Sequence, residues 1–319
     1  MKKLSVIFCV LILYIVTASV SAASLVPGGQ LVGIHLQDDT VSVAEFHEAL
    51  GENAKKAGLR TGDRILRINN TPVKSTADVQ KAMSQTKGKV QLCVLREDKT
   101  KVISFAPAIT EEGAKLGIYL KQGTTGVGTV TYYDPEKGSY AALGHGVNTK
   151  SGNLLTLRAG NVYAATVRSV KKGTIGTPGQ LMGQLTDQTP IGTVTKNTAQ
   201  GIFGSLGAPE AETPIPVAAP EEVKTGQATI RSTIDGVSLQ EYSVEILKIY
   251  PNSKDRTRNM LIKVTDPALL QATGGIVQGM SGSPIIQNGK LVGAVTHVLV
   301  NDPTTGYGIF IENMLEAAA

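Results

Sequence analysis

The stretch Gly-Gly-Ile-Val-Gln-Gly-Met-Ser-Gly-Ser-Pro, residues 274–284, sets a serine in a glycine-rich turn that ends in a proline. A serine hydroxyl is a weak nucleophile until a base and an oxyanion site activate it. Because Gly279 has no side chain, the backbone can turn so that the amides of Gly279 and Ser281 point to one spot in front of the Ser281 hydroxyl. The turn therefore predicts a nucleophile with an oxyanion hole, although Gly-x-Ser-Gly also occurs in ordinary hairpins whose serine bonds its own backbone.

Short apolar strands surround this turn throughout the C-terminal part of the chain. They are separated by Gly, Asn, Asp and Pro at a spacing of about ten residues, which is typical of barrels and sandwiches. Aromatic residues make up only 4%, Trp is absent, and Gly reaches 35 of the 319 residues. This composition favours strands and tight turns over long helices. We expect a mainly β fold in which residues 115–319 form two small barrels.

Charge and spacing exclude several classes of function. The net charge of +5 includes Lys2 and Lys3, and elsewhere basic and acidic residues are interleaved, so nothing resembles a nucleic-acid footprint. The glycine pairs do not open recognisable helices, so no dinucleotide cofactor is expected. His35 and His47 have no Cys or His partner at metal-ligand spacing, and we expect no metal site.

A candidate base lies upstream, in Ala141-Ala142-Leu143-Gly144-His145-Gly146. The histidine follows a small apolar strand, and the flanking glycines leave its ring accessible. Imidazole is the side chain whose ordinary pKa suits a base near neutral pH. Alone, His145 could be a structural histidine. A histidine at a strand end followed by a glycine-embedded serine is, however, the order of two-barrel serine proteases, and Pro284 marks Ser281 rather than Ser283 as the reactive position.

A third residue must bond the far imidazole nitrogen and hold its tautomer. Chain order favours a carboxylate between His145 and Ser281. Asp187 sits where a chymotrypsin-like order would place it, and Asp266, in Val264-Thr265-Asp266-Pro267, is the other contender. The residues alone leave this choice open. Three other aspartates in the same unit are available for this role: Asp235, Asp255 and Asp302. Asp302 is excluded because it follows Ser281 in the chain.

Residues 28–107 combine strands with a helical pattern, which indicates a small, partly open barrel. The run Lys56-Ala57-Gly58-Leu59-Arg60-Thr61-Gly62-Asp63-Arg64-Ile65-Leu66-Arg67-Ile68-Asn69 closely resembles the centre of PDZ domains of bacterial exported proteases. We expect Asp63, Arg67 and Glu97 to lie on the solvated surface of this domain.

The PDZ resemblance implies a peptide-binding groove between the strand at residues 34–36 and the helix that carries Val79 and Met83. A partner's end would add there as an extra strand. The backbone amides of Val32, Gly33 and Ile34 would serve as the carboxylate loop. The alternative is a packing module without a ligand.

Residues 1–23 have the pattern of a targeting segment: Lys2-Lys3, an apolar run, and small residues that end in Val20-Ser21-Ala22-Ala23. The pattern fits a secretory signal peptide, but the apolar run could also remain as a membrane anchor. We expect export, with cleavage or retention left open.

Several segments together look like the stage IV sporulation protein B peptidase family. They are Gly126-Val127-Gly128-Thr129-Val130-Thr131-Tyr132-Tyr133-Asp134-Pro135, Ala142-Leu143-Gly144-His145-Gly146, the stretch 274–286, and Gly289-Lys290-Leu291-Val292-Gly293-Ala294-Val295-Thr296-His297. The similarity covers nearly the whole chain. It implies a signal or anchor, a PDZ domain and a trypsin-like serine peptidase that crosses the forespore membrane into the intermembrane space during endospore formation.

The same resemblance implies that His145 is the base, Ser281 the nucleophile and Asp266 the orienting carboxylate. It also implies that the substrates are the protein itself and a membrane-bound regulator of the late mother-cell sigma factor, without a cofactor. In two-barrel proteases the strand after the serine turn borders the specificity pocket, so His297 is expected to line that pocket or to be an ordinary strand histidine.

The sequence therefore predicts an exported serine endopeptidase with a PDZ domain, residues 28–107, that controls access to substrate. Two other classes stay open. One is a non-catalytic scaffold that binds peptides, and the other is an esterase, which the absence of a strand-to-helix nucleophile elbow disfavours.

Overall fold

The computed structural model describes residues 23–149, 152–254 and 256–319. The predicted targeting segment, apart from Ala23, lies outside the described residues, and so does Asp255. Within the described ranges, no helix is both long and apolar enough to cross a bilayer.

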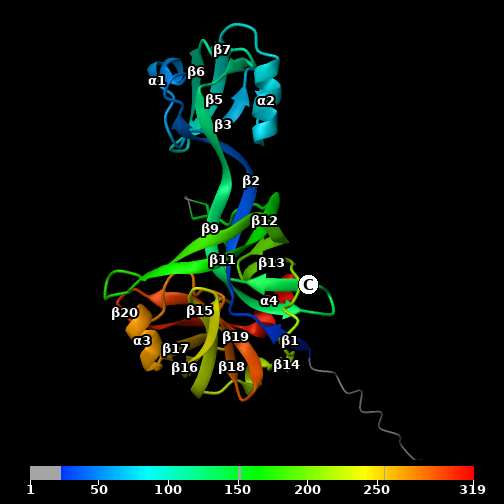
Figure 1. Cartoon of the computed structure of the whole chain (residues 1–319), viewed down its shortest axis with the longest axis vertical. Helices are drawn as coiled ribbons and strands as arrows, with labels where there is room; N and C mark the ends of the chain where they lie inside the picture. Colours follow the sequence, from blue (N-terminus) through cyan, green and yellow to red (C-terminus); the bar gives the residue numbers. More distant parts are fainter. Residues whose placement is uncertain (1–22, 150–151, 255) are drawn as a thin grey trace, which may run out of the picture.

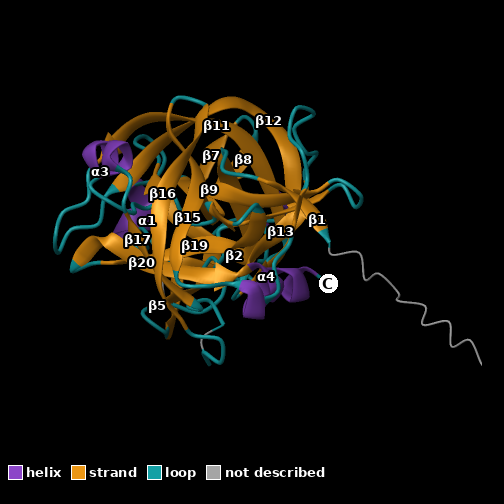
Figure 2. Cartoon of the chain, turned by 90° about the horizontal axis from the view of Figure 1, so that it is seen from below, coloured by secondary structure: helices purple, strands orange, loops and turns teal. Residues whose placement is uncertain are grey.

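Two β-barrels form the body of the molecule, and a smaller domain stands on one side of them (Figure 1). Strands make up nearly all of the body, and helices α3 (Pro267–Thr273) and α4 (Ile311–Ala318) lie on its outside (Figure 2). This architecture confirms the prediction of a mainly β chain with two barrels.

The first barrel is closed by the pairing of β2 with β9. Hydrogen-bonded neighbours run β9-β10-β13-β12-β11-β2, and β2 returns to β9 with Leu31 opposite Thr129. Strand β1 adds to β9 and pairs in turn with β14. The bounds are β1 (Ser24–Pro27), β2 (Leu31–Phe46), β9 (Ile118–Asp134), β10 (Ser139–Ala142), β11 (Ala159–Lys171), β12 (Gln180–Thr198), β13 (Gly201–Ser205) and β14 (Ile215–Pro216).

The second barrel closes in the order β15-β16-β17-β20-β19-β18. Its strands follow the period-two rule: on β16, Tyr242, Val244 and Ile246 point into the core while their neighbours are exposed. The bounds are β15 (Gly226–Asp235), β16 (Ser238–Ile249), β17 (Met260–Val264), β18 (Pro284–Gln287), β19 (Lys290–Leu299) and β20 (Asp302–Phe310), with a 3-10 turn η1 (Pro220–Glu222) before them.

The small domain is inserted into the first barrel, because β2 and β9 run out of the barrel side by side and continue into it (Figure 1). Val32 and Ile34 on β2 belong to the barrel core, whereas Val41 and Val43 on the same strand belong to the core of the small domain. The other elements of this domain are α1 (Glu52–Lys56), β3 (Arg64–Ile68), β4 (Thr71–Pro72), α2 (Thr76–Ser84), β5 (Val90–Arg96), β6 (Lys99–Phe105), β7 (Ala108–Thr110) and β8 (Gly113–Lys115).

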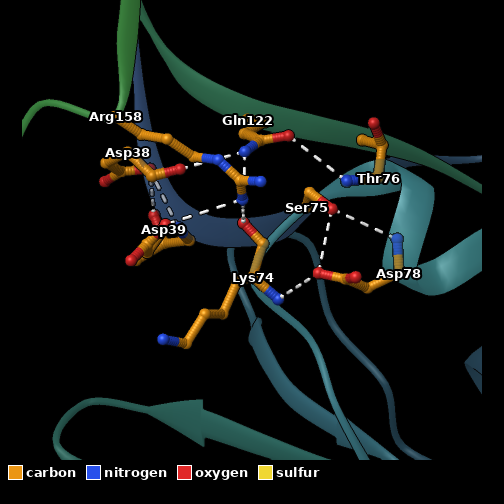
Figure 3. Close-up of polar contacts among 9 residues, drawn as sticks. Asp38, Asp39, Lys74, Ser75, Thr76, Asp78, Gln122 and Arg158 are labelled. Atoms are coloured by element: carbon orange, nitrogen blue, oxygen red, sulfur yellow. Dashed lines mark hydrogen bonds and ion pairs between the residues drawn. The ribbon is translucent and has the colours of Figure 1, made fainter.

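A polar junction, formed by Asp39, Lys74, Gln122 and Arg158, joins the small domain to the first barrel (Figure 3). Arg158, which directly precedes β11, donates from Nη1 to the Lys74 carbonyl (3.1 Å) and lies 3.6 Å from a carboxylate oxygen of Asp39. The Gln122 side chain on β9 donates to the same Lys74 carbonyl and accepts from the Thr76 amide at the start of α2. The N-terminal end of α2 is thus tied to the barrel.

The prediction that Asp63 lies on a solvated surface is wrong, because its side chain is 1% exposed. Arg96 donates to both carboxylate oxygens at 2.6 Å, and the Arg60 amide donates to one of them. Burial alone would raise the pKa of Asp63, but these hydrogen bonds and the Arg96 charge outweigh it and hold the pKa below its ordinary value. The charge is tolerated inside because Arg96 pairs with it.

Candidate active site

The serine turn lies between the two barrels and is built around two glycines with left-handed backbone. Gly279 has φ +101° and Gly282 has φ +98°. A Cβ at Gly282 would lie 2.1 Å from the Thr129 carbonyl oxygen, and one at Gly279 would touch Leu181. Both positions therefore require glycine, for conformation and for space.

The predicted oxyanion donors are the amides of Gly279 and Ser281, and the hydrogen bonds of the carbonyls before them show which way they face. The Gln278 carbonyl accepts from the Leu181 amide (2.8 Å), and the Met280 carbonyl accepts from the Ser283 amide (2.9 Å). In a trans peptide the C=O and the N–H of one peptide unit point in opposite directions. The Gly279 amide therefore points away from Leu181, and the Ser281 amide points away from the Ser283 amide. Among the described residues, neither amide donates to a protein acceptor. Both are available to a substrate oxygen.

His145 of the first barrel and Ser281 of the second both contact the same stretch of β19, at His297 and Thr296. His145 follows β10, and its ring lies 5.2 Å from that of His297, centroid to centroid. Residue 297 is next to Thr296, whose carbonyl accepts a hydrogen bond from the Ser281 hydroxyl (2.9 Å). In this structure the Ser281 hydroxyl therefore donates its proton to a carbonyl; the predicted role as nucleophile would require the hydroxyl to turn toward the imidazole.

The surroundings of His145 favour the neutral form of its ring. Its half-buried ring makes a hydrogen bond of 3.0 Å between Nδ1 and the Gly146 carbonyl. Burial lowers the pKa of His145 below its ordinary value, and the bond to Gly146 opposes this only in part. Because a carbonyl can only accept, Nδ1 carries the proton and Nε2 is left as the basic nitrogen.

Thr129 on β9 makes hydrogen bonds both to the segment before His145 and to the serine turn. The Thr129 carbonyl accepts from the Leu143 amide, two residues before His145 (3.2 Å). Its amide donates to the Ser281 carbonyl (3.1 Å), and its hydroxyl donates to the Gly279 carbonyl (2.7 Å). Sequence reasoning missed Thr129; the only available signal was a threonine within the apolar run of residues 127–133.

The structure does not bring either predicted carboxylate to His145. Asp266 is the N-cap of α3: one oxygen accepts from the Ala268 and Leu269 amides, and the other from the Ser243 amide. Asp187 is exposed, and its carboxylate bonds Thr189 in a local turn. Both carboxylates are occupied by backbone or neighbouring groups, which corrects their predicted placement beside the imidazole.

The small domain has a groove of about 1130 Å³ between α2 and the start of β9. Val79 and Met83 line it from α2, and Leu116, Ile118 and Leu120 line it from the opposite wall. Along Ile118–Gln122 the only strand of the described chain that pairs with β9 is β2, so the edge facing α2 is open to an added strand.

The predicted carboxylate loop is not part of this groove. Val32, Gly33 and Ile34 pair with β11 on one side and β9 on the other, inside the first barrel. The groove has Leu116-Gly117-Ile118 instead, with Gly117 at φ +71°. The correction follows from β2 continuing through two domains, which the two separate apolar runs of the sequence did not reveal.

In the described part of the chain, no three or more His, Cys, Asp or Glu side chains lie together in a group that could hold a metal ion.

Two closed barrels with a histidine from one and a glycine-embedded serine from the other define a serine peptidase, here with an inserted PDZ domain. The model of the SpoIVB peptidase S55 family matches residues 112–315, and a PDZ domain model matches residues 51–96. The chain belongs to the SpoIVB peptidase S55 family.

Among solved structures, the active form of the Rv3671c protease from M. tuberculosis is 19% identical, with a TM-score of 0.37 over 60% of this chain and 72% of that one. The HtrA-type protease AlgW, solved with a decapeptide, is 12% identical, with a TM-score of 0.36 over 66% of this chain and 57% of that one. No curated protein matches the chain significantly in sequence.

Proposed function

We propose that this serine peptidase is exported across the forespore membrane and acts in the intermembrane space during endospore formation. It cleaves itself and a membrane-bound regulatory protein, which leads to activation of the late mother-cell sigma factor. Family membership supports this role, and so does the N-terminal sequence, in which Lys2 and Lys3 precede an apolar run.

The observation that supports the chemistry is that His145 and Ser281 contact adjacent residues of β19, His297 and Thr296, and that the amides of Gly279 and Ser281 have no acceptor among the described residues. Nε2 of His145 takes the proton of the Ser281 hydroxyl as its oxygen attacks the scissile carbonyl. The amides of Gly279 and Ser281 receive the oxyanion of the tetrahedral intermediate. The protonated imidazole then passes its proton to the leaving amine, and water releases the acyl group by the reverse sequence.

N-terminal sequencing of the purified protein tests this proposal. Wild-type protein should yield a self-cleaved form, whereas Ser281→Ala and His145→Ala should remain uncleaved while folded. A fluorophosphonate should label wild type and not Ser281→Ala. Normal processing by purified Ser281→Ala, free of other proteases, would contradict the assignment of the nucleophile.

The physiological substrate is tested separately. Forespore membranes are incubated with wild-type or Ser281→Ala protein, and new protein N-termini are labelled and sequenced. A membrane-bound protein cleaved only by the wild type supports the proposed role. An active enzyme that cleaves itself but no membrane protein would refute that role and leave the peptidase chemistry intact.

The PDZ domain controls the peptidase in this proposal. Support comes from the groove between α2 and β9 and from the polar junction, which ties α2 to Arg158 at the end of the loop that begins after His145 (Figure 3). Asn197 also holds this loop, through the Val147 amide and carbonyl and the Leu155 carbonyl. A peptide that displaces α2 would therefore act on the histidine side of the site.

A further inference from the structure

Thr129 is a buried polar residue in an apolar strand, with 1% of its surface exposed. A buried hydroxyl is costly unless it is hydrogen-bonded. Its Oγ1 donates to the carbonyl of Gly279, 150 residues away in the sequence, at 2.7 Å. This short bond crosses from β9 of the first barrel to the nucleophile turn of the second.

The carbonyls of four consecutive residues of the turn, 278–281, each accept a hydrogen bond. Those of Gln278 and Met280 bond the Leu181 and Ser283 amides, and those of Gly279 and Ser281 bond the Thr129 hydroxyl and amide. The Gly279 carbonyl is the only one of the four that a side chain holds. The N–H of the same peptide, that of Met280, donates within the turn to the Val277 carbonyl (3.1 Å), so among the described residues the Thr129 hydroxyl is the group that holds this peptide from outside the turn.

That peptide lies directly between the two amides of the oxyanion hole. Gly279 has no Cβ, so its own backbone preference does little to select one orientation of the peptide. A rotation there would turn the Ser281 amide and hydroxyl relative to the Gly279 amide. Since catalysis needs both donors directed at the developing oxyanion, a small loss of order in this peptide costs rate.

We propose that Thr129 is a positioning residue for the reaction: its hydroxyl holds the Gly279 carbonyl and so keeps the oxyanion turn in its catalytic form. The inference rests on the serine peptidase mechanism proposed above. Thr129 touches neither substrate nor the reacting atoms, and it acts through the Gly279-Met280 peptide. The closing experiment separates this role from general packing.

The chain offers a matched control two residues along the same strand. Thr131 is also fully buried, and its hydroxyl has no hydrogen-bond partner among the described residues. Thr129→Val and Thr131→Val make the same change of hydroxyl to methyl, but only the first removes a bond to the serine turn. Thr129→Ser keeps the hydroxyl and removes a methyl group.

The experiment measures kcat and KM of the full-length protein on one peptide substrate, with the rate of fluorophosphonate labelling and the melting temperature of each variant. Thr129→Val should lower kcat about tenfold, which corresponds to about 1.4 kcal/mol of transition-state stabilisation, and leave KM within about twofold. Thr129→Ser should restore most of kcat, and Thr131→Val should match wild type.

Equal kcat values for Thr129→Val and Thr131→Val would overturn the proposal. So would a Thr129→Ser variant as slow as Thr129→Val, because the methyl group would then be what matters. If Thr129→Val does not fold, Thr129→Ser alone decides: near wild-type kcat supports the role of the hydroxyl, and a large loss refutes it. A wild-type protein that neither reacts with the fluorophosphonate nor cleaves peptides would instead refute the peptidase mechanism.

Discussion

The imidazole rings of His145 and His297 lie 5.2 Å apart at an angle of 38°, one at the end of a strand of the first barrel and the other on β19 of the second. The contact covers one side of the base. The sequence predicts that His297 either lines the specificity pocket or is an ordinary strand histidine, and the structure places its ring against that of His145, the candidate base. This makes its ring part of the packing that orients His145.

His297→Ala should therefore lower kcat/KM by about twofold to tenfold, since an aromatic pair contributes about 0.5–1.5 kcal/mol. Steady-state kinetics on a short peptide measure this effect. His47→Ala is the control, because His47 makes a similar ring contact with Tyr119, in the PDZ domain. Equal kinetics for His297→Ala and wild type would show that the ring does not orient the base.

The pH profile of kcat/KM should report the lowered pKa of His145. Burial disfavours the imidazolium, so the base stays neutral to a lower pH than a free histidine, and activity should fall only as pH drops below 6.5. Unfolded His145 takes up its proton at a higher pH than folded His145. Between these two pKa values the unfolded state binds more protons, and the free energy of unfolding should fall as pH falls. An acidic limb centred above pH 7 would contradict this assignment.

Asp266→Ala should lower the free energy of unfolding by about 1 kcal/mol, because the helix α3 loses its N-cap. Asp266→Asn should lower it less, since asparagine also caps helices. Denaturant titrations of the two variants measure the difference. Loss of activity on the order of 10⁴ in a stable Asp266→Asn protein would instead place this carboxylate at the imidazole during catalysis.

Asp63→Ala should destabilise the PDZ domain by about 3–5 kcal/mol, because the substitution leaves the Arg96 guanidinium in a largely buried position without its partner. Chemical denaturation of the full chain, followed by hydrogen exchange in β3 and β5, measures the loss. Since the folded pKa of Asp63 is lowered, the stability that this pair supplies is present above the unfolded pKa of about 3.9 and disappears as pH falls through the folded value. Lys56→Ala, which breaks an exposed pair with Glu52, is the control.

Arg158→Gln should weaken the communication between the PDZ groove and the peptidase without changing stability by more than about 1 kcal/mol, because the side chain is half exposed. Peptides that bind the groove and alter kcat of the wild type should lose that effect in the variant. Lys137→Gln, which removes a surface ion pair with Asp134, should behave like wild type. An undiminished response in Arg158→Gln would exclude the polar junction as the route.

The fold class could be predicted because it depends on local signals, and the candidate pair His145 and Ser281 was chosen from local signals too. The spacing of short strands indicated barrels, and glycines around His145 and Ser281 marked an accessible base and a tight turn. Contacts distant in sequence had no such signal. The pairing of Asp63 with Arg96 and the bond from Thr129 to Gly279 arise only when β3 meets β5 and β9 meets the serine turn.

The peptide groove shows the same limit. The PDZ resemblance placed Val79 and Met83 on one wall of the groove, where the structure has them, but it assigned the opposite wall to the wrong strand. The run that ends at Leu36 and the one that begins near Val41 look like two strands of one domain, although they are a single strand shared by two domains. Local pattern does not tell which core a strand enters.

Because the PDZ domain is connected covalently to the peptidase only through the paired strands β2 and β9, it could be deleted without breaking either barrel. Leu36 and Thr124 are paired neighbours at the point where both strands leave the barrel, so their Cα atoms lie about 5 Å apart. A tight turn of about two residues could bridge them and restore a plain hairpin. The two barrels could therefore be produced as a shortened chain without the PDZ domain. A different recognition domain could also be inserted between Leu36 and Thr124 without changing the strand order of either barrel.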